Sequence, residues 1–320
     1  MKILITGING FAGTYLANHL SKIDNSSVIA GVDISTGNFF EKFEGNKNNT
    51  ELFNIDLTDE NDVDKLIRDF IPDQVYHLAA QASVSNSWKE PVNTFKNNVF
   101  GGVNLLESIR KYNNKCRFLS VCTAEVYGIS ENPSMPIKEE DRIYPTNPYA
   151  ISKAALDFFS ITYYLGYKIP VFVSRSFNHI GPGQSIGFVC SDFAKQIAQI
   201  EKKLRKPEIF VGNLEACRDF LDVRDVVNAY YYIMNKGKPG EVYNICSGEK
   251  IKISDILKTL ISFSKEKNVA VRVDSSKLRP VDNKIMYGDN SKIKEHTGWL
   301  PGYSINETLK DILNYWRNIV

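Results

Sequence analysis

Short apolar runs alternate with longer amphipathic stretches through the first half of the chain. The apolar runs are rich in β-branched residues, as buried strands are, and lie at 2–6, 27–32, 74–78, 117–121 and 171–174. Between them, residues 12–21 and 98–112 carry apolar positions at helical spacing. This alternation predicts an α/β fold, in which helices cover both faces of a parallel sheet.

The pattern changes after Asn178, where Gly181-Pro182-Gly183 interrupts it. Residues 222–236 then predict one more helix, and residues 241–246 one more strand. The rest of the chain alternates helices with short strands. We therefore expect a doubly wound parallel sheet accompanied by a smaller, mostly C-terminal α/β substrate-binding lobe.

A glycine-rich turn, Gly7 to Gly13, follows the first predicted strand and leads into the first predicted helix. Glycines let the backbone approach a dinucleotide's pyrophosphate, and the N–H groups at a helix start attract its negative charge. A tight loop would also use glycines, but a turn between a strand and a helix favours the binding interpretation. The residues of this turn that we expect to contact the cofactor are Gly7, Asn9, Gly10, Phe11, Ala12 and Gly13.

This turn identifies the larger unit as a Rossmann-type, NAD-binding domain. We expect the chain to leave the sheet near Asn178 and to return near Arg218. The predicted NAD-binding domain therefore comprises residues 1–177 plus 219–246. The predicted substrate-binding lobe comprises residues 178–218 plus 247–320.

Asp33 follows the second predicted strand, where a carboxylate can bind the adenosine ribose hydroxyls and repel a 2′-phosphate. No arginine comes next, because residues 34–36 are Ile, Ser and Thr. NAD(H) is therefore expected to be favoured over NADP(H), unless Asp33 is only a solvated residue at a strand end. Asp56 and Leu57 end the third predicted strand and are expected to border the adenine, although Asp56 could equally cap a helix.

Composition argues against several classes of partner. The 39 basic and 37 acidic residues leave a net charge of +2, which favours no nucleic-acid partner. No apolar run approaches the roughly 20 residues of a membrane span, and the first residues lack a signal-peptide pattern. Five scattered cysteines and four histidines without ligand spacing predict free thiols, a cytoplasmic location and no metal site.

Tyr149 and Lys153 lie four residues apart, on one face of a predicted helix. A phenol with a pKa of about 10 is a poor acid or base near neutrality, and a neighbouring ammonium is expected to lower that pKa. Surface pairs show the same spacing, so the pair alone is weak evidence. Thr123 leaves an upstream strand and could hydrogen-bond the same substrate oxygen, and Glu125 follows two residues later.

Together these motifs resemble the extended short-chain dehydrogenase/reductase family over essentially the whole chain. The resemblance makes Tyr149 the acid/base, gives Lys153 the roles of binding ribose and tuning the phenol, and places Thr123 at the carbonyl. It also implies further cofactor contacts, from Leu78, Ala79, Ala80, Gln81, Asn98 and His179.

The run from Arg175 to Gln184 resembles the nucleotide-sugar branch of this family, and later segments are similar to its GDP-6-deoxy-D-mannose reductases. The resemblance places Asn178 at the substrate diphosphate. Guanidinium groups bind diphosphates bidentately, which suggests Arg218 and Arg279 for the same group. The remaining residues expected at the substrate are Ser83, Thr123, Val189 and Asp192.

Asp192 and a further arginine, Arg224, also have interpretations that involve no substrate. Asp192 could accept hydrogen bonds from a guanine base, but it could equally cap a helix. Arg224 is expected to be solvated or ion-paired at a helix start rather than to bind the substrate.

The reaction that the resemblance favours is reduction of the C4 keto group of GDP-4-keto-6-deoxy-D-mannose by a nicotinamide cofactor. The principal alternative is a GDP-mannose or GDP-heptose 4,6-dehydratase, with Glu125 as the base that acts at C5. A non-catalytic nucleotide-sensing protein would be expected to lose Tyr149 or Lys153, and both are present. The resemblance also suggests a homodimer formed through two helices of the large domain.

Overall fold

A seven-stranded parallel sheet forms the centre of the protein in a computed structural model that describes residues 1–128, 135–278 and 283–320. Its order across the sheet is β11 (Val242–Ile245), β6 (Val171–Ser176), β5 (Arg117–Thr123), β4 (Gln74–His77), β1 (Lys2–Thr6), β2 (Val28–Asp33) and β3 (Thr50–Asn54). Every neighbouring pair is parallel. The predicted α/β fold with a doubly wound parallel sheet is confirmed.

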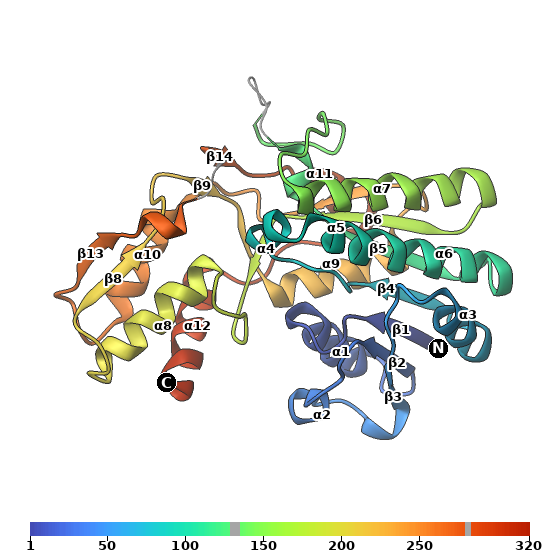
Figure 1. The fold of residues 1–320 in the computed structure, drawn as a ribbon, viewed down its shortest axis with the longest axis horizontal. Helices are drawn as coiled ribbons and strands as arrows, with labels where there is room; N and C mark the ends of the chain where they lie inside the picture. Colours follow the sequence, from blue (N-terminus) through green and yellow to red (C-terminus); the bar gives the residue numbers. More distant parts are fainter. Residues whose placement is uncertain (129–134, 279–282) are drawn as a thin grey trace.

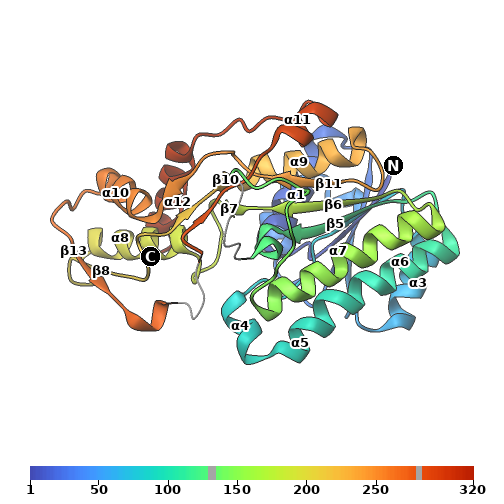
Figure 2. The same ribbon diagram turned by 90° about the horizontal axis from the view of Figure 1, so that it is seen from above.

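Helices cover both faces of this sheet (Figures 1 and 2). One face carries α3 (Glu60–Phe70), α6 (Gly101–Tyr112) and α7 (Pro148–Tyr167), and the other carries α1 (Phe11–Ile23) and α9 (Val223–Lys236). The alternation of side chains along a strand explains how one strand serves both faces. In β1, Leu4 packs into the first core, whereas Ile3 and Ile5 pack into the second.

The direction of chain progression reverses between β1 and β4, because β1 pairs with β2 on one side and with β4 on the other. In open α/β sheets the crevice at such a reversal, beside the carboxyl ends of the strands, is the usual ligand site. The glycine turn follows β1 directly, and the 78–81 segment follows β4. Both segments therefore lie at this crevice.

The second part of the molecule has its own apolar core, at the left of Figure 1. It contains α8 (Val189–Glu201), β8 (Glu208–Val211), α10 (Ile253–Phe263), β13 (Ala270–Val273) and α12 (Ile305–Ile319). Strands β7 (Asn178–Ile180) and β10 (Phe220–Asp222) pair in parallel where the chain leaves and returns. Ile293 and Trp299 pack into the core beneath α9, so part of the C-terminal segment joins the large sheet's core.

The remaining elements are short. They are α2 (Phe39–Lys42), α4 (Val84–Lys89), α5 (Pro91–Phe95), β9 (Cys217–Arg218), β12 (Ile251–Lys252), β14 (Ile285–Met286), α11 (Ser291–Thr297) and the 3-10 turns η1 (Lys47–Asn49), η3 (Ala124–Tyr127) and η4 (Ser275–Lys277). Some element boundaries differ from the prediction, two of them at predicted cofactor residues. The helix expected at 98–112 starts with a π-helical turn, η2 (Lys96–Phe100), and β3 ends at Asn54 rather than at Leu57.

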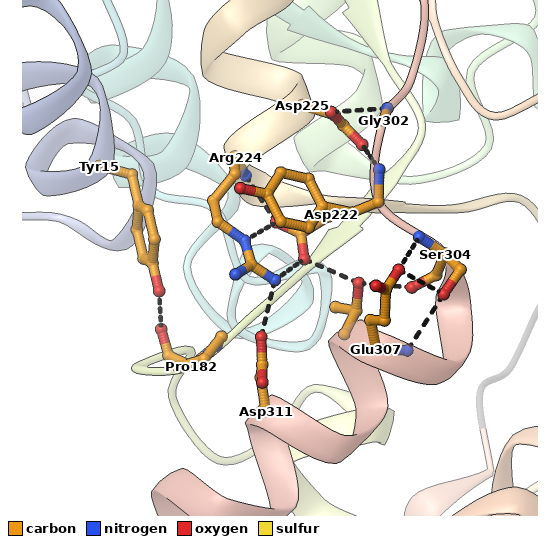
Figure 3. Close-up of polar contacts among 11 residues, drawn as sticks. Tyr15, Pro182, Asp222, Arg224, Asp225, Gly302, Ser304, Glu307 and Asp311 are labelled. Carbon is orange, nitrogen blue, oxygen red and sulfur yellow. Dashed lines mark hydrogen bonds and ion pairs between the residues drawn. The ribbon is translucent and has the colours of Figure 1, made fainter.

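A polar joint connects α9 to α12 (Figure 3). Arg224 donates from Nε and Nη2 to the two carboxylate oxygens of Asp222, at 2.8 and 2.6 Å, and from Nη2 to Asp311 Oδ2 at 2.9 Å. Its guanidinium lies 3.8 Å from the centre of the Tyr303 ring. The prediction that Arg224 is ion-paired at a helix start is confirmed.

Three further properties hold for the described residues. No helix there is long and apolar enough to cross a membrane. No group of three or more His, Cys, Asp or Glu side chains in that part of the chain is arranged to hold a metal ion. All five cysteines are free, and four of them are buried.

Candidate active site

The glycine turn between β1 and α1 leaves no room for side chains. Gly7 has φ of +70°, and a Cβ there would lie 2.8 Å from the Ala79 nitrogen. At Gly13 a Cβ would lie only 2.1 Å from the Gly7 carbonyl oxygen. These two positions require glycine, because a side chain would collide with backbone rather than with a flexible group. The turn is therefore a close-packed cradle at the start of a helix.

The first turn of α1 suits an anion. Gly10 is the N-cap and, having no side chain, contributes no capping hydrogen bond. N–H groups at such a helix start, with the positive end of the helix dipole behind them, can bind a pyrophosphate. Phe11, in this turn, stacks on His179 with ring centres 6.1 Å apart and an interplanar angle of 8°. Ala12 follows Phe11 in the same turn.

Asp33 ends β2 beside the glycine turn. Its carboxylate accepts hydrogen bonds from the backbone nitrogens of Asn9, at 3.2 Å, and Ser35, at 3.5 Å. The side-chain amide of Asn9 donates from Nδ2 to the Ser35 carbonyl oxygen at 3.1 Å. These contacts hold the carboxylate next to the turn, where it can receive ribose hydroxyls.

Asp56 and Leu57 lie beyond the end of β3. Asp56 does not cap α3, because Asp59 is the N-cap of that helix. Instead Asp56 accepts from the Thr58 backbone nitrogen at 2.9 Å, and this bond lowers its pKa. Leu57 is buried, and its carbonyl accepts from Asn104.

The segment Leu78–Gln81 leaves β4 and is tied to its neighbours by backbone hydrogen bonds. Leu78 donates to the Thr6 carbonyl at 3.2 Å, and the Ala79 nitrogen donates to Thr6 Oγ1 at 3.3 Å. The fully buried Asn98, within the π-helical turn, accepts from the Gln81 nitrogen at 2.7 Å and donates to the Gln81 carbonyl at 3.2 Å. Ala80 lies between these anchored residues, so the whole segment has a fixed path.

Asn98 also connects this segment to the catalytic helix α7. Its amide donates to Ser152 Oγ at 2.9 Å, and Ser152 donates to the Tyr149 carbonyl at 2.7 Å. The predicted cofactor loop and the predicted acid/base therefore share one hydrogen-bonded chain. Ser152 was not among the predicted site residues, although its place between Tyr149 and Lys153 was a usable signal.

Thr123, Tyr149 and Lys153 meet at the carboxyl end of β5. The Tyr149 hydroxyl shares a side-chain hydrogen bond with Thr123. Lys153, which is 3% exposed, donates from Nζ to the Val121 carbonyl oxygen at 2.8 Å. Pro148 and the Asn147 cap begin α7 just before Tyr149. The spacing of Tyr149 and Lys153 thus places both groups against the strand that carries Thr123.

Burial dominates the titration of this pair. It raises the pKa of Tyr149 above its ordinary value, and the hydrogen bond with Thr123 only opposes the rise. Burial also lowers the pKa of Lys153. The groups that shift the pKa of Tyr149 are burial, Cys122, Thr123, Glu125 and Tyr230. Lys153 is not one of them, so its expected effect on the phenol stays a prediction. Tyr149 remains a protonated phenol, which is the form that can donate a proton.

Glu125 lies in η3, directly after Thr123. Its backbone nitrogen donates to Thr123 Oγ1 at 3.3 Å. The Asn147 amide donates to Glu125 Oε2 at 3.5 Å, while Asn147 Oδ1 accepts from Ala150 and caps α7. Asn147 was not among the predicted site residues, although an Asn-Pro pair before Tyr149 is a helix-start signal that could have identified it.

The predicted substrate residues have different environments. Asn178, which begins β7, is exposed, and Ser83 caps α4 by accepting from Asn86 at 3.2 Å. Val189 is the first residue of α8. Arg279 lies outside the described residues.

Arg218 is 8% exposed and is connected to the catalytic end of β5. It donates from Nη1 to the Asn283 carbonyl at 2.7 Å, and Asn283 donates to the Gly128 carbonyl at 3.1 Å. Gly128 ends the turn that contains Glu125. Asn283 thus links the predicted diphosphate arginine to the predicted catalytic turn.

Asp192 lies in the first turn of α8 and is already engaged. It accepts from the Gly187 nitrogen at 2.8 Å and pairs with Lys277 at 2.8 Å. A cavity of about 350 Å³ borders this pair, lined by Ile186, Asp192, Lys195, Gln196, Gln199, Arg205, Phe210, Asp274 and Lys277. Any hydrogen bond that Asp192 accepts from a base must therefore compete with the one that it accepts from Lys277.

The chain is similar to known proteins over nearly its whole length. The family described as GDP-mannose 4,6 dehydratase matches residues 4–312. The GDP-6-deoxy-D-mannose reductase of Pseudomonas aeruginosa is 31% identical over 319 residues, which cover 100% of this chain and 98% of that protein. The GDP-mannose 4,6-dehydratase of Yersinia enterocolitica is 27% identical, over 98% of this chain and 92% of that protein.

A solved structure shows the same likeness in three dimensions. The RMD protein of Pseudomonas aeruginosa, complexed with NADPH, superposes with a TM-score of 0.87 at 30% identity, over 100% of this chain and 99% of that one. The chain belongs to the GDP-mannose 4,6-dehydratase-like group of the extended short-chain dehydrogenase/reductase family. The family resemblance inferred from the motifs is thereby confirmed.

Proposed function

We propose that this protein is a nicotinamide-dependent reductase that reduces the C4 keto group of GDP-4-keto-6-deoxy-D-mannose to the corresponding GDP-6-deoxy sugar. The observation that carries the proposal is the meeting of Thr123, Tyr149 and Lys153 at the crevice of the sheet, in a chain 31% identical to a GDP-6-deoxy-D-mannose reductase. A nucleotide-sensing protein without activity would have no use for a buried phenol and a buried ammonium at this place.

The structure offers a fitting place for the cofactor. The close-packed turn at Gly7 and Gly13, where an added Cβ would collide with backbone, brings the start of α1 close to β1, and the N–H groups at that uncapped start suit a pyrophosphate. Asp33 would hold the adenosine ribose, the 78–81 segment and Lys153 would lie along the nicotinamide ribose, and Phe11 and His179 would border the pyrophosphate. When bound, the reduced nicotinamide supplies the hydride.

The chain's own residues handle the proton and the developing charge. Thr123 donates a hydrogen bond to the C4 carbonyl oxygen of the sugar and orients it. As that oxygen gains negative charge, Tyr149 transfers its phenolic proton to it. The ammonium of Lys153, held by Val121, stabilises the phenolate that remains. Solvent then returns the proton to Tyr149.

Asp33 supports a preference for NAD(H). A 2′-phosphate would approach a carboxylate that already accepts two backbone hydrogen bonds, and the repulsion would disfavour it. The Pseudomonas aeruginosa RMD structure holds NADPH, so the preference rests on Asp33 in this chain and not on that relative.

A dehydratase is the second candidate, and Glu125 is the observation that favours it. Glu125 lies two residues after Thr123, and its carboxylate accepts a hydrogen bond from Asn147 that would orient it as a base acting at C5. The Yersinia enterocolitica dehydratase is also similar over nearly the whole chain. We favour the reductase because the 31% identity to the Pseudomonas aeruginosa reductase exceeds the 27% identity to the Yersinia enterocolitica GDP-mannose dehydratase, and because a protonated Tyr149 suits proton donation.

The diphosphate and base of the substrate are assigned to the lobe. Arg218, together with Asn178, would contact the diphosphate, since Arg218 is connected through Asn283 to the catalytic turn. Val189 would border the nucleoside at the start of α8, and Ser83 the sugar at the start of α4. Asp192 would bind guanine by exchanging its contact with Lys277 for the base.

A homodimer is also proposed. The outer face of α7 exposes Ile151, Phe158, Phe159 and Leu165, and exposed Val92, Phe95 and Phe100 lie on the adjoining α5 and η2. A contiguous apolar face of this kind is typical of a protein interface. A second copy of the chain would cover it through paired helices. Analytical ultracentrifugation of Phe158→Glu against the wild type tests this, because a charge there should produce monomers.

Isotope transfer tests the reaction itself. The protein is incubated with the 4-keto sugar and NADH that carries deuterium at the transferable position of the nicotinamide ring. The reductase places deuterium on C4 of the sugar, which mass spectrometry and proton NMR detect. Deuterium absent from a product that nevertheless forms would exclude reduction by this cofactor.

A further inference from the structure

A buried polar cluster lies directly behind the catalytic residues. Arg175 of β6 is 4% exposed, and its Nε donates to Asp157 Oδ2 at 2.8 Å, while Asp157 itself is 1% exposed. From Nη1 the same guanidinium donates to the Tyr127 hydroxyl at 3.1 Å and to the Glu139 carbonyl at 3.0 Å. The Tyr127 hydroxyl then donates to Asn244 Oδ1 at 2.7 Å. None of these residues belongs to the reaction described above.

The sheet register places Arg175 and Asn244 of this cluster in one row with Cys122. Arg175 is the direct partner of Cys122 in β5 and of Asn244 in β11. Cys122 precedes Thr123, so the row lies one residue below the catalytic end of β5. Side chains fixed in this row constrain how the helix and the turn that pack against it are placed and tilted.

Two of the contacts reach catalytic segments. On α7, Asp157 comes one turn after Lys153, which comes one turn after Tyr149, so all three lie on one helix face. The Cys122 thiol reinforces this contact by donating to the Lys153 carbonyl at 3.4 Å. On the other side, Tyr127 ends the turn that starts at Thr123. One guanidinium therefore holds both the helix that carries the proton donor and the turn that carries its hydrogen-bond partner.

Stability is a weak explanation for such a cluster. Removing an arginine and an aspartate from water costs free energy that their attraction only partly returns, and apolar residues of similar size often stabilise a core as well or better. The guanidinium geometry matters more here, because its planar fork makes three contacts in fixed directions. A lysine also has several N–H donors, but they lie on one nitrogen at the end of a flexible stem and have no fixed planar arrangement.

We propose that Arg175 and Asp157 are positioning residues that set the distance between Tyr149 and Thr123, and hence the alignment of the proton donor with the substrate oxygen. The inference rests on the proposed reduction, in which both hydroxyl groups address the same carbonyl oxygen. We call the Arg175–Asp157 pair, with its contact to Tyr127, the clamp. Through Tyr127 the clamp also fixes the turn that bears Glu125.

The test replaces the ion pair by apolar groups, Asp157→Leu together with Arg175→Met. We expect a folded protein with a thermal midpoint near that of the wild type, unchanged affinity for NADH and an unchanged KM for the sugar. The kcat should fall about tenfold to a hundredfold, the size expected from a small misplacement of reacting groups. Arg117→Met is the matched control and should leave kcat unchanged, since this arginine lies at the opposite end of β5, where its side chain donates to the Met234 carbonyl and packs over the Phe172 ring.

A folded double variant with wild-type kcat overturns the proposal. If that variant does not fold, Tyr127→Phe decides, because it deletes the hydroxyl between Arg175 and Asn244 and keeps the ion pair. A stable Tyr127→Phe protein with a severalfold lower kcat supports the clamp, and one with full kcat overturns it. If the wild-type protein converts GDP-mannose instead of the 4-keto sugar, the proposed reduction is refuted, but the positioning role of Arg175 and Asp157 is not. The variants are then compared on GDP-mannose, where the same phenol acts.

Discussion

The ammonium of Lys153 donates a hydrogen bond to the Val121 carbonyl oxygen at 2.8 Å, two residues before Thr123 on β5. This contact ties the catalytic helix to the strand whose end carries the partner of Tyr149. It also keeps a positive charge in a buried site, where an unpaired charge would be costly. In the proposed reduction, Lys153 would stabilise the phenolate when it forms, and burial raises the pKa of the phenol beforehand.

Tyr149→Phe should reduce kcat by at least about a hundredfold, because the proton donor is lost and positioned proton transfer contributes that much. NADH affinity should change little, since the ring and its packing remain. Steady-state kinetics and calorimetric titration measure the two effects. Tyr167→Phe, on the exposed part of the same helix, is the control and should retain full activity. If the Tyr149→Phe enzyme kept more than about a tenth of the wild-type rate, another group would be the proton donor.

The pH profile of reduction should be flat on its alkaline side up to about pH 10, the ordinary pKa of a phenol. Burial raises the pKa of Tyr149 above that value, so the donating form persists as the pH rises. The sign is fixed by the direction of the reaction: reduction needs the protonated phenol and is lost only above the raised pKa. The measurement is kcat at saturating NADH and sugar from pH 6 to 10. A fall in kcat centred near pH 7 would show that the phenol is acidified in the complex.

Asp33→Ser should shift cofactor preference toward NADPH. The carboxylate disfavours a 2′-phosphate, and close like-charge repulsion of about 1 kcal/mol or more corresponds to roughly tenfold in affinity. Wild-type protein should bind NADH about tenfold more tightly than NADPH, and the variant should lose that difference. Asp56→Ser, which changes the other carboxylate expected near the adenosine, is the control. Equal affinities of the wild-type protein for NADH and NADPH would show that Asp33 does not determine the cofactor preference.

Substitution of glycine by alanine should have opposite effects in the glycine turn and in an ordinary helix. Gly13→Ala forces a Cβ to within 2.1 Å of the Gly7 carbonyl, so it should lower the thermal midpoint and abolish tight NADH binding. Gly166→Ala, near the end of α7, meets no atom within 4 Å and should stabilise the protein by up to about 1 kcal/mol. Thermal denaturation with and without NADH measures both. A stable Gly13→Ala protein that binds NADH normally would contradict the close-packed turn.

The sequence was a good guide to the sheet and to the catalytic pair. Alternating apolar runs predict β1 without error, because buried parallel strands are apolar on both faces, and the spacing of Tyr149 and Lys153 follows directly from helix geometry. Local patterns predict such features well because neighbouring residues determine them. The π-helical turn at Asn98 is different, since it depends on hydrogen bonds to Gln81 and Ser152 that are distant in sequence.

Long-range contacts also explain what the sequence did not reveal. Burial, which raises the pKa of Tyr149, is a property of the folded surroundings and not of the Tyr-Lys spacing. The ion pair of Asp192 with Lys277 joins residues 85 positions apart, so no local pattern announces it. Arg175 was part of a recognised motif, yet its pairing with Asp157 became visible only in the fold.

The stoichiometry of NADH tests the central claim most directly. A reductase leaves its hydride on the sugar, whereas a dehydratase takes a hydride from C4 and returns it to C6, so its cofactor ends each cycle unchanged. We predict one NADH oxidised per molecule of GDP-4-keto-6-deoxy-D-mannose consumed, no reaction with GDP-mannose alone, and a Glu125→Gln variant that loses only a modest part of its activity. Loss of water from GDP-mannose without NADH consumption, abolished by Glu125→Gln, would contradict the reductase and establish the dehydratase.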